Sequence, residues 1–202
     1  MIKILNSINL HNTLEIPEDN KIYIEGYCCH FNQVNMNGEM VRPGAFDEFF
    51  KLLQDKKNMP MMNAFHKSDL IIGVWTDIRQ DENGLWVEGY VDLNIKQVAD
   101  NLAPLIRTGG LNNLSTEGWV SYNDIEEAED HYIVNKMILT GISLVPIGAD
   151  MDTKFTIQET PKSDENHNEP NENPTEPVEN QLDPKNQNKN EKSVSKQLLF
   201  YI

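Results

Sequence analysis

The chain has 202 residues, and its 32 Asp and Glu against 17 Lys and Arg give a formal net charge of −15. A chain of this length can bury a substantial core in one domain, while an acidic surface repels phosphate groups and argues against a nucleic-acid partner. Residues 1–7 are too short and polar for a signal peptide, and no apolar run approaches the roughly 18 residues of a membrane span, so we expect a cytoplasmic protein without membrane contact.

The first predicted strand covers residues 22–28, which are rich in β-branched and aromatic side chains. Cys28 and Cys29 follow each other at its end, where neighbouring side chains point to opposite faces. We therefore expect two free, buried thiols in a reducing compartment rather than a disulfide. Since Cys and His residues do not cluster at metal-ligand spacing, no metal and no cofactor are expected.

Two helices are expected on the outside of the domain. The first, at 45–57, has Phe and Leu side chains at helical spacing on one face and charged side chains on the other. The second, at 95–108, contains Pro104, which should kink or interrupt it, and Gly109 and Gly110 should end it.

Strand patterns account for most of the remaining chain up to residue 158. Residues 81–84 form a predicted hairpin turn, because Asn-Gly is the pair best able to adopt positive φ. Further strands are expected at 70–79, 85–92, 115–122, 131–134, 136–145 and 154–158. The fold class predicted from these elements is mainly β (α+β), an antiparallel β-barrel, closed or nearly closed, with flanking helices, over residues 1–158.

The composition changes abruptly after this domain. Residues 159–193 are rich in Asn, Glu and Pro and cannot bury enough apolar area to offset their ordering entropy, so we expect a disordered linker. Residues 194–202 are an apolar C-terminal tail, and such a cap on a tether is typical of a docking peptide. Packing of the tail back on its own domain is the alternative.

One histidine and one serine stand out as a candidate catalytic pair. His66 ends an apolar stretch just before the strand at 70–79, and Ser115 follows the glycine turn at 109–110. A hydroxyl beside an imidazole is the minimal apparatus for nucleophilic acyl transfer, because the imidazole removes the hydroxyl proton. Spacing alone does not pair the two residues, and a core histidine and a polar strand residue remain the alternatives.

Six groups of residues occur in one order between about residues 24 and 152. They are Gly26-Tyr27 with Phe31-Asn32, residues 38–46, Asn63-Ala64-Phe65-His66 with residues 72–75, residues 84–89, Leu111 to Ser115, and residues 142–146 with Ala149-Asp150. This ordered set resembles the tailed-phage (caudovirus) prohead protease family, capsid-maturation serine proteases related in fold to the herpesvirus assemblins. The resemblance implies an assemblin-like barrel, with Ser115 as nucleophile and His66 as general base.

Two departures from the family pattern leave the third catalytic member open. The family pattern Leu-x-Glu-Val-Ser corresponds to residues 139–143, where Gly141 has no side chain to orient an imidazole. Glu117 lies in the segment that replaces the usual small, Gly-containing continuation after Ser115, and strand alternation puts both on one face. The candidates are Thr140, His131 and Glu117, and a Ser/His dyad is a further alternative.

The resemblance implies a serine endopeptidase, a hydrolase of peptide bonds, that acts during bacteriophage virion assembly inside the prohead in the host bacterial cytoplasm. The expected substrates are the scaffold protein or the scaffolding segment of the major capsid protein, and the protease itself, with autocleavage within about 161–196. Self-association is also expected. The alternative, favoured by Gly141 and Glu117, is a catalytically inactive protease-fold module that acts in assembly through its tail. An esterase of unrelated fold is disfavoured, because a Gly-x-Ser-x-Gly elbow is absent around Ser115.

Overall fold

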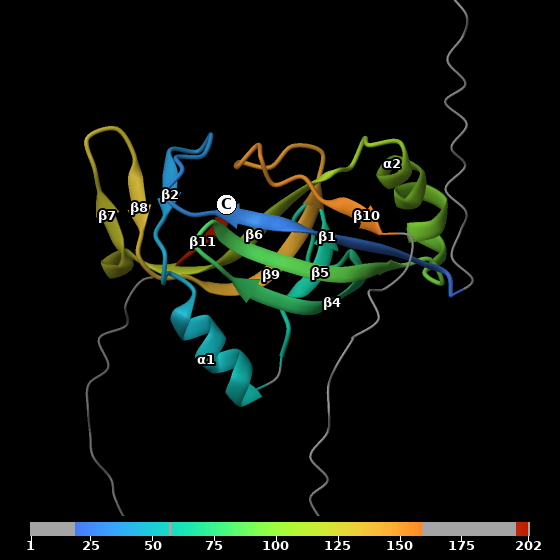
Figure 1. Ribbon diagram of the computed structural model, residues 1–202, viewed down its shortest axis with the longest axis horizontal. Coiled ribbons are helices and arrows are strands. Elements are labelled where there is room, and N and C mark those ends of the chain that lie inside the picture. The colour runs from blue at the N-terminus through green and yellow to red at the C-terminus, as the bar shows by residue number, and fades with distance from the viewer. Residues whose placement is uncertain (1–18, 57, 159–196, 202) are drawn as a thin grey trace, which may run out of the picture.

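The computed structural model describes residues 19–56, 58–158 and 197–201. Strands predominate (Figure 1), which confirms the predicted fold class. Two short helical segments are labelled η, a π-helix (η1) and a 3₁₀ turn (η2). The elements are β1 (Lys21–His30), β2 (Glu39–Val41), α1 (Asp47–Lys56), β3 (Met61–Ala64), β4 (Ile71–Gln80), β5 (Gly84–Asp92), η1 (Val98–Leu102), α2 (Ala103–Arg107), β6 (Asn113–Ser121), η2 (Tyr122–Asp124), β7 (Ile125–Glu127), β8 (Tyr132–Val134), β9 (Ile138–Val145), β10 (Thr156–Gln158) and β11 (Gln197–Tyr201).

The main sheet has eight strands in the order β10-β1-β5-β4-β3-β9-β6-β11, and a second sheet has the order β2-β8-β7. Neighbouring strands are antiparallel except in the pairs β3–β9 and β2–β8, which are parallel. The main sheet curls on itself, because Asn113 at the start of β6 forms a bridge with Lys154, just before β10. Figure 1 shows α1 and α2 outside this curled sheet, as predicted for the flanking helices.

A single apolar core lies within the curl of the main sheet. Its fully buried members include Ile24 of β1, Met62 of β3, Leu114 of β6 and Ile142 of β9. Phe46, just before α1, is also fully buried, whereas the acidic side chains in the first turn of α1 are exposed. Burial of such side chains is the main favourable term in folding, so the core fixes how β3, β6 and β9 lie together.

The second predicted helix is interrupted, as the position of Pro104 led us to expect. Residues Val98–Leu102 form a π-helix, and α2 begins directly after it with Pro104 in its first turn, where a backbone N–H is not needed. The helix ends before Gly109, whose φ of 76° is the left-handed conformation that favours glycine.

The predicted hairpin turn between β4 and β5 is present, but its mechanism differs from the expectation. Neither Asn83 nor Gly84 is among the described residues with positive φ. Instead, the Asp81 carboxylate accepts hydrogen bonds from the backbone N–H of Asn83 (2.7 Å) and of Gly84 (3.1 Å). Gly84 is required for another reason, because a Cβ there would collide with the carbonyl oxygen of Cys29 on the paired strand.

Four strands were not predicted as such. Of these, β2, β3 and β7 are short and contain Glu, Asn or Ala, which are depleted in strands, whereas β8, which is equally short and was predicted, consists of Tyr, Ile and Val. The fourth, β11, lies within the expected apolar tail, while the expected linker at 159–193 falls outside the described residues. In the part of the chain that the structure describes, no helix is long and apolar enough to cross a membrane.

Both thiols should be unreactive in the folded protein. Cys28 and Cys29 are free and buried, as predicted, and burial raises the pKa of each thiol because it disfavours the thiolate. We expect an aromatic disulfide reagent to titrate both thiols in guanidinium chloride and neither within minutes in buffer. Rapid reaction of either thiol in buffer, with the protein folded by circular dichroism, would contradict the buried positions.

Candidate active site

The candidate site lies across three neighbouring strands, with β9 in the middle. β9 pairs in parallel with β3 and antiparallel with β6, so that Ser143 is opposite Asn63 on one side and opposite Ser115 on the other. In the next row of the same strands, Gly141 is opposite Glu117. Directly opposite residues in a sheet point to the same face, so Ser115, Ser143 and Asn63 form one row across the sheet.

His66 follows β3 in a tight turn with an uncommon backbone conformation. Phe65 and His66 both have positive φ, 57° and 56°, which costs roughly 1 kcal/mol or more for each residue that is not glycine. Hydrogen bonds to β9 hold the turn, since the N–H of Phe65 donates to the carbonyl of Leu144 (3.0 Å) and the N–H of His66 donates to Oγ of Ser143 (3.1 Å). Backbone strain of this kind occurs at functional sites.

A buried chain of hydrogen bonds connects this turn to Glu117. The hydroxyl of Ser143, which accepts from His66, donates in turn to Oδ1 of Asn63. The amide of Asn63 donates from Nδ2 to Oε1 of Glu117 at 2.6 Å. Asn63 and Ser143 are completely buried and Glu117 is 5% exposed, so these bonds form with almost no competition from water.

Glu117 is the acidic group beside the imidazole. Its Oε2 lies 3.4 Å from Nδ1 of His66, an ion-pair distance that lacks the alignment of a hydrogen bond. The side chain reaches this position by crossing over Gly141 on β9, where a Cβ would collide with Oε1 of Glu117. The missing side chain at position 141 and the acid at position 117 are therefore two parts of one arrangement.

The Glu117 carboxyl is held in its charged form. Burial by itself raises the pKa of a carboxyl, but the close contact with the His66 imidazole, its charge and the hydrogen bond from Asn63 outweigh this effect and lower the pKa of Glu117 below its usual value. A carboxylate that stays ionised next to Nδ1 can orient an imidazole and stabilise it when it becomes protonated.

The structure places the other two candidates for the third member away from the imidazole. Thr140 is the extra residue of a β-bulge between Glu117 and Gly118, and its hydroxyl donates to the backbone carbonyl of Glu117 (3.2 Å). It therefore fixes the backbone of Glu117. His131 precedes β8 in the three-stranded sheet, where its Nδ1 lies 2.7 Å from Oδ1 of Asp130.

Asn63 and Ser143 were not identified as site residues from the sequence. Both lie inside the motifs that carry the resemblance, Asn63 three residues before His66 and Ser143 in the closing strand. Their role depends on the pairing of β3 with β9, which a sequence pattern does not reveal.

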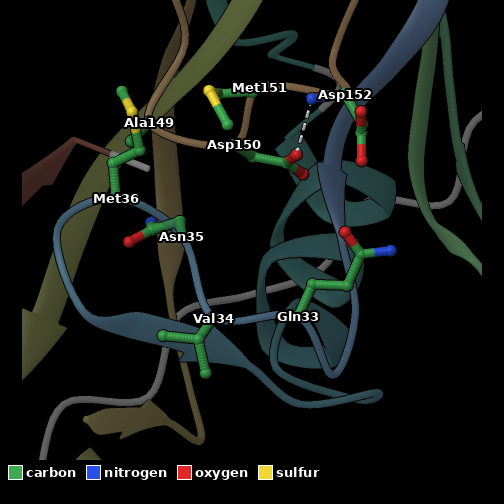
Figure 2. A pocket seen from close by; sticks show the side chains of 8 residues that line it. All are labelled: Gln33, Val34, Asn35, Met36, Ala149, Asp150, Met151 and Asp152. Atoms are coloured by element: carbon green, nitrogen blue, oxygen red, sulfur yellow. Dashed lines mark hydrogen bonds between the residues drawn. The ribbon is translucent and has the colours of Figure 1, made fainter.

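Away from the candidate site, a hollow lies between the loop after β1 and the loop after β9. Figure 2 shows the eight side chains that line it, among them Asp150 and Asp152. The Asp150 carboxylate is engaged within the protein, because it accepts hydrogen bonds from the N–H of His30 (3.0 Å) and of Asp152 (3.0 Å) and lies 2.8 Å from Nδ1 of His30. This carboxylate therefore ties the loop after β9 to the end of β1.

The chain is similar to viral capsid proteases. The profile of the caudovirus prohead serine protease family matches residues 10–168. Over 101 residues the chain is 30% identical to the prohead protease of Enterobacteria phage HK97, a match that covers 50% of this chain and 43% of the HK97 protein.

The solved structure of a phage capsid protease extends the similarity to the fold. The bacteriophage T4 capsid assembly protease has a TM-score of 0.50 and 22% identity, over 61% of this chain and 80% of the T4 chain. The varicella-zoster virus protease has a TM-score of 0.43 and 16% identity, over 70% of this chain and 65% of the viral protease. The family profile spans every strand from β1 to β10 and includes His66, Ser115 and Glu117, and on this evidence the chain belongs to the caudovirus prohead serine protease family.

Proposed function

We propose that this protein is a serine endopeptidase of phage capsid maturation in which Ser115 is the nucleophile, His66 the general base and Glu117 the positioning acid. The observation that carries the proposal is the arrangement around β9. Ser115 and Glu117 lie two residues apart on β6, Glu117 is 3.4 Å from His66, and Ser143, opposite Ser115, binds the backbone of His66.

The proposed chemistry follows from which imidazole nitrogen Glu117 approaches. Because Glu117 lies beside Nδ1 of His66, the other nitrogen, Nε2, is left to take the proton of Ser115. The Ser115 oxygen then attacks the scissile carbonyl, and the imidazolium returns the proton to the leaving amine. Water repeats the sequence and releases the acyl group from Ser115.

The names of the similar proteins support the proposed setting. One is the prohead protease of phage HK97 and another is the capsid assembly protease of phage T4. The match with this chain spans less than half the length of the HK97 protein. We propose that the substrates are the scaffold protein or the scaffolding segment of the major capsid protein, within the prohead in the host cytoplasm. Autocleavage between about residues 161 and 196, a region outside the described residues, belongs to the same proposal.

The decisive test is cleavage of the phage's own capsid-protein precursor, read by intact mass. The wild type should cut the precursor and shorten its own chain, while Ser115→Ala should do neither. Ser68→Ala, which removes an exposed hydroxyl, is the matched control and should keep full activity. Failure of the folded wild type to cut an assembled precursor would favour the alternative, a non-catalytic assembly module.

The arrangement of Glu117 over Gly141 can be tested by changing each residue separately and then by exchanging the two. Glu117→Gln removes the charge and should lower kcat by roughly 10³- to 10⁴-fold, by analogy with loss of the acid in a serine protease triad. Gly141→Ala should also lower activity, because the added Cβ displaces the carboxylate.

The double variant Glu117→Gly with Gly141→Glu moves the acid to the opposite residue of the paired strand. It should recover at least tenfold over Glu117→Gln, because an acid is again available to the imidazole. A double variant that folds but is no better than Glu117→Gln would contradict the assignment, and so would full activity of Glu117→Gln.

Asn63 should affect the pH at which the Glu117 carboxylate becomes protonated. In Asn63→Leu, burial still raises the pKa of Glu117 while one of the hydrogen bonds that lowers it is gone. The carboxylate then takes up its proton at a higher pH, so the titration profile of the Glu117 carboxyl, followed by carbon-13 NMR, should move to higher pH. Asn101→Leu, at an exposed position of η1, should leave the profile unchanged. An unshifted profile in Asn63→Leu would show that Asn63 does not stabilise the charged acid.

A further inference from the structure

The C-terminal segment forms the last strand of the main sheet, directly beside the candidate site. β11 pairs antiparallel with β6, from Gln197 opposite Ser121 to Tyr201 opposite Glu117 (Figure 1). It therefore covers the outer edge of the strand that carries both Ser115 and Glu117. An uncovered strand edge presents a row of backbone groups that can pair with another extended chain.

The direction of β11 relates it to the cleavage chemistry. Tyr201 is opposite Glu117, and β11 runs antiparallel to β6, so a peptide that continues in this register passes Thr116 and then reaches Ser115. A peptide bound in this way would bring the residue two positions beyond the equivalent of Tyr201 opposite Ser115. β11 thus lies where the N-terminal side of a substrate peptide would pair by strand addition.

Side-chain contacts bring the segment against the catalytic base itself. The ring of Tyr201 lies 4.5 Å, centroid to centroid, from the imidazole of His66 at an interplanar angle of 60°, an edge-to-face arrangement. The carbonyl of Tyr201 accepts a hydrogen bond from Nδ2 of Asn37 (3.1 Å), and Phe200 packs against the core. The attachment is limited, because Leu199 and Tyr201 remain 42% and 40% exposed.

We propose that residues 197–201 are an internal ligand of the peptide-binding edge of β6, which keeps substrate away from Ser115 and His66 until it is displaced. The proposal rests on the proposed function. The partner that this edge fits is an extended segment with an aromatic side chain next to His66, and a capsid-protein segment of this kind competes with β11. The covalent connection maintains a high effective concentration of the internal ligand, while the partial exposure of Leu199 and Tyr201 makes displacement easier.

The test compares the rate at which a fluorophosphonate probe labels Ser115 in the full chain. Phe200→Asp places a charge against the core and should release β11, and Tyr201→Ala removes only the contact with His66. If β11 is bound in about nine molecules of ten, Phe200→Asp should accelerate labelling roughly tenfold, and Tyr201→Ala by less. Ile147→Asp, which adds the same charge at a residue that is 68% exposed, should label at the wild-type rate.

Hydrogen exchange separates release of the strand from the chemistry. In a Ser115→Ala background, Phe200→Asp should accelerate amide exchange across residues 117–121 of β6. Faster exchange without faster labelling would overturn the inhibitory role, because the strand would then leave without exposing the site. If labelling of the wild type slows as the protein concentration rises, residues 197–201 of a second copy cover β6, and the proposal that the ligand belongs to the same chain is overturned. Absence of labelling in every variant would overturn the proposed function itself, whatever the exchange shows.

Discussion

The central position of β9 is the constraint on which the site depends. Its two edges are hydrogen-bonded to β3 and β6, and these two ladders fix the register of both neighbours at once. A slip of one residue in either ladder would turn Ser115 or Asn63 to the opposite face. The buried apolar side chains on these strands, such as Met62, Leu114 and Ile142, oppose such a slip because it would remove them from the core. Core packing thereby determines the geometry of the site.

The electrostatic arrangement follows from that register. Burial raises the pKa of the Glu117 carboxyl, and the imidazole of His66 and the amide of Asn63 outweigh this effect. The same amide is held by Ser143, which also restrains the strained turn at His66. One set of buried polar groups thus supports both the charge of the acid and the position of the base, so removal of any member affects both.

The sequence alone predicted the main features of the fold, because the long strands and both helices show clear periodicity or breaker residues. The short strands β2, β3 and β7 were not predicted, since they contain Glu, Asn or Ala, which are depleted in strands. The Asn83-Gly84 turn was predicted correctly, but neither residue has the positive φ on which the prediction rested. Within the site, His66 and Ser115 were singled out by their motifs. The choice among Thr140, His131 and Glu117 could not be made, because it depends on contacts between strands that are distant in sequence.

The place of Gly141 beneath the Glu117 side chain has a consequence for how this family is compared. In an alignment, each position is read in its own column, and by that reading Gly141 alone would suggest that the site has no acid. In the folded protein the two positions are opposite each other on paired strands, and the Glu117 carboxylate extends over Gly141 to lie 3.4 Å from the imidazole of His66. Two acids there would repel each other in a buried space, and two glycines would leave the base unsupported. The two columns should therefore covary, with one acid and one small residue shared between them, and an apparent loss of the catalytic acid in one column should be checked against its neighbour across the strand.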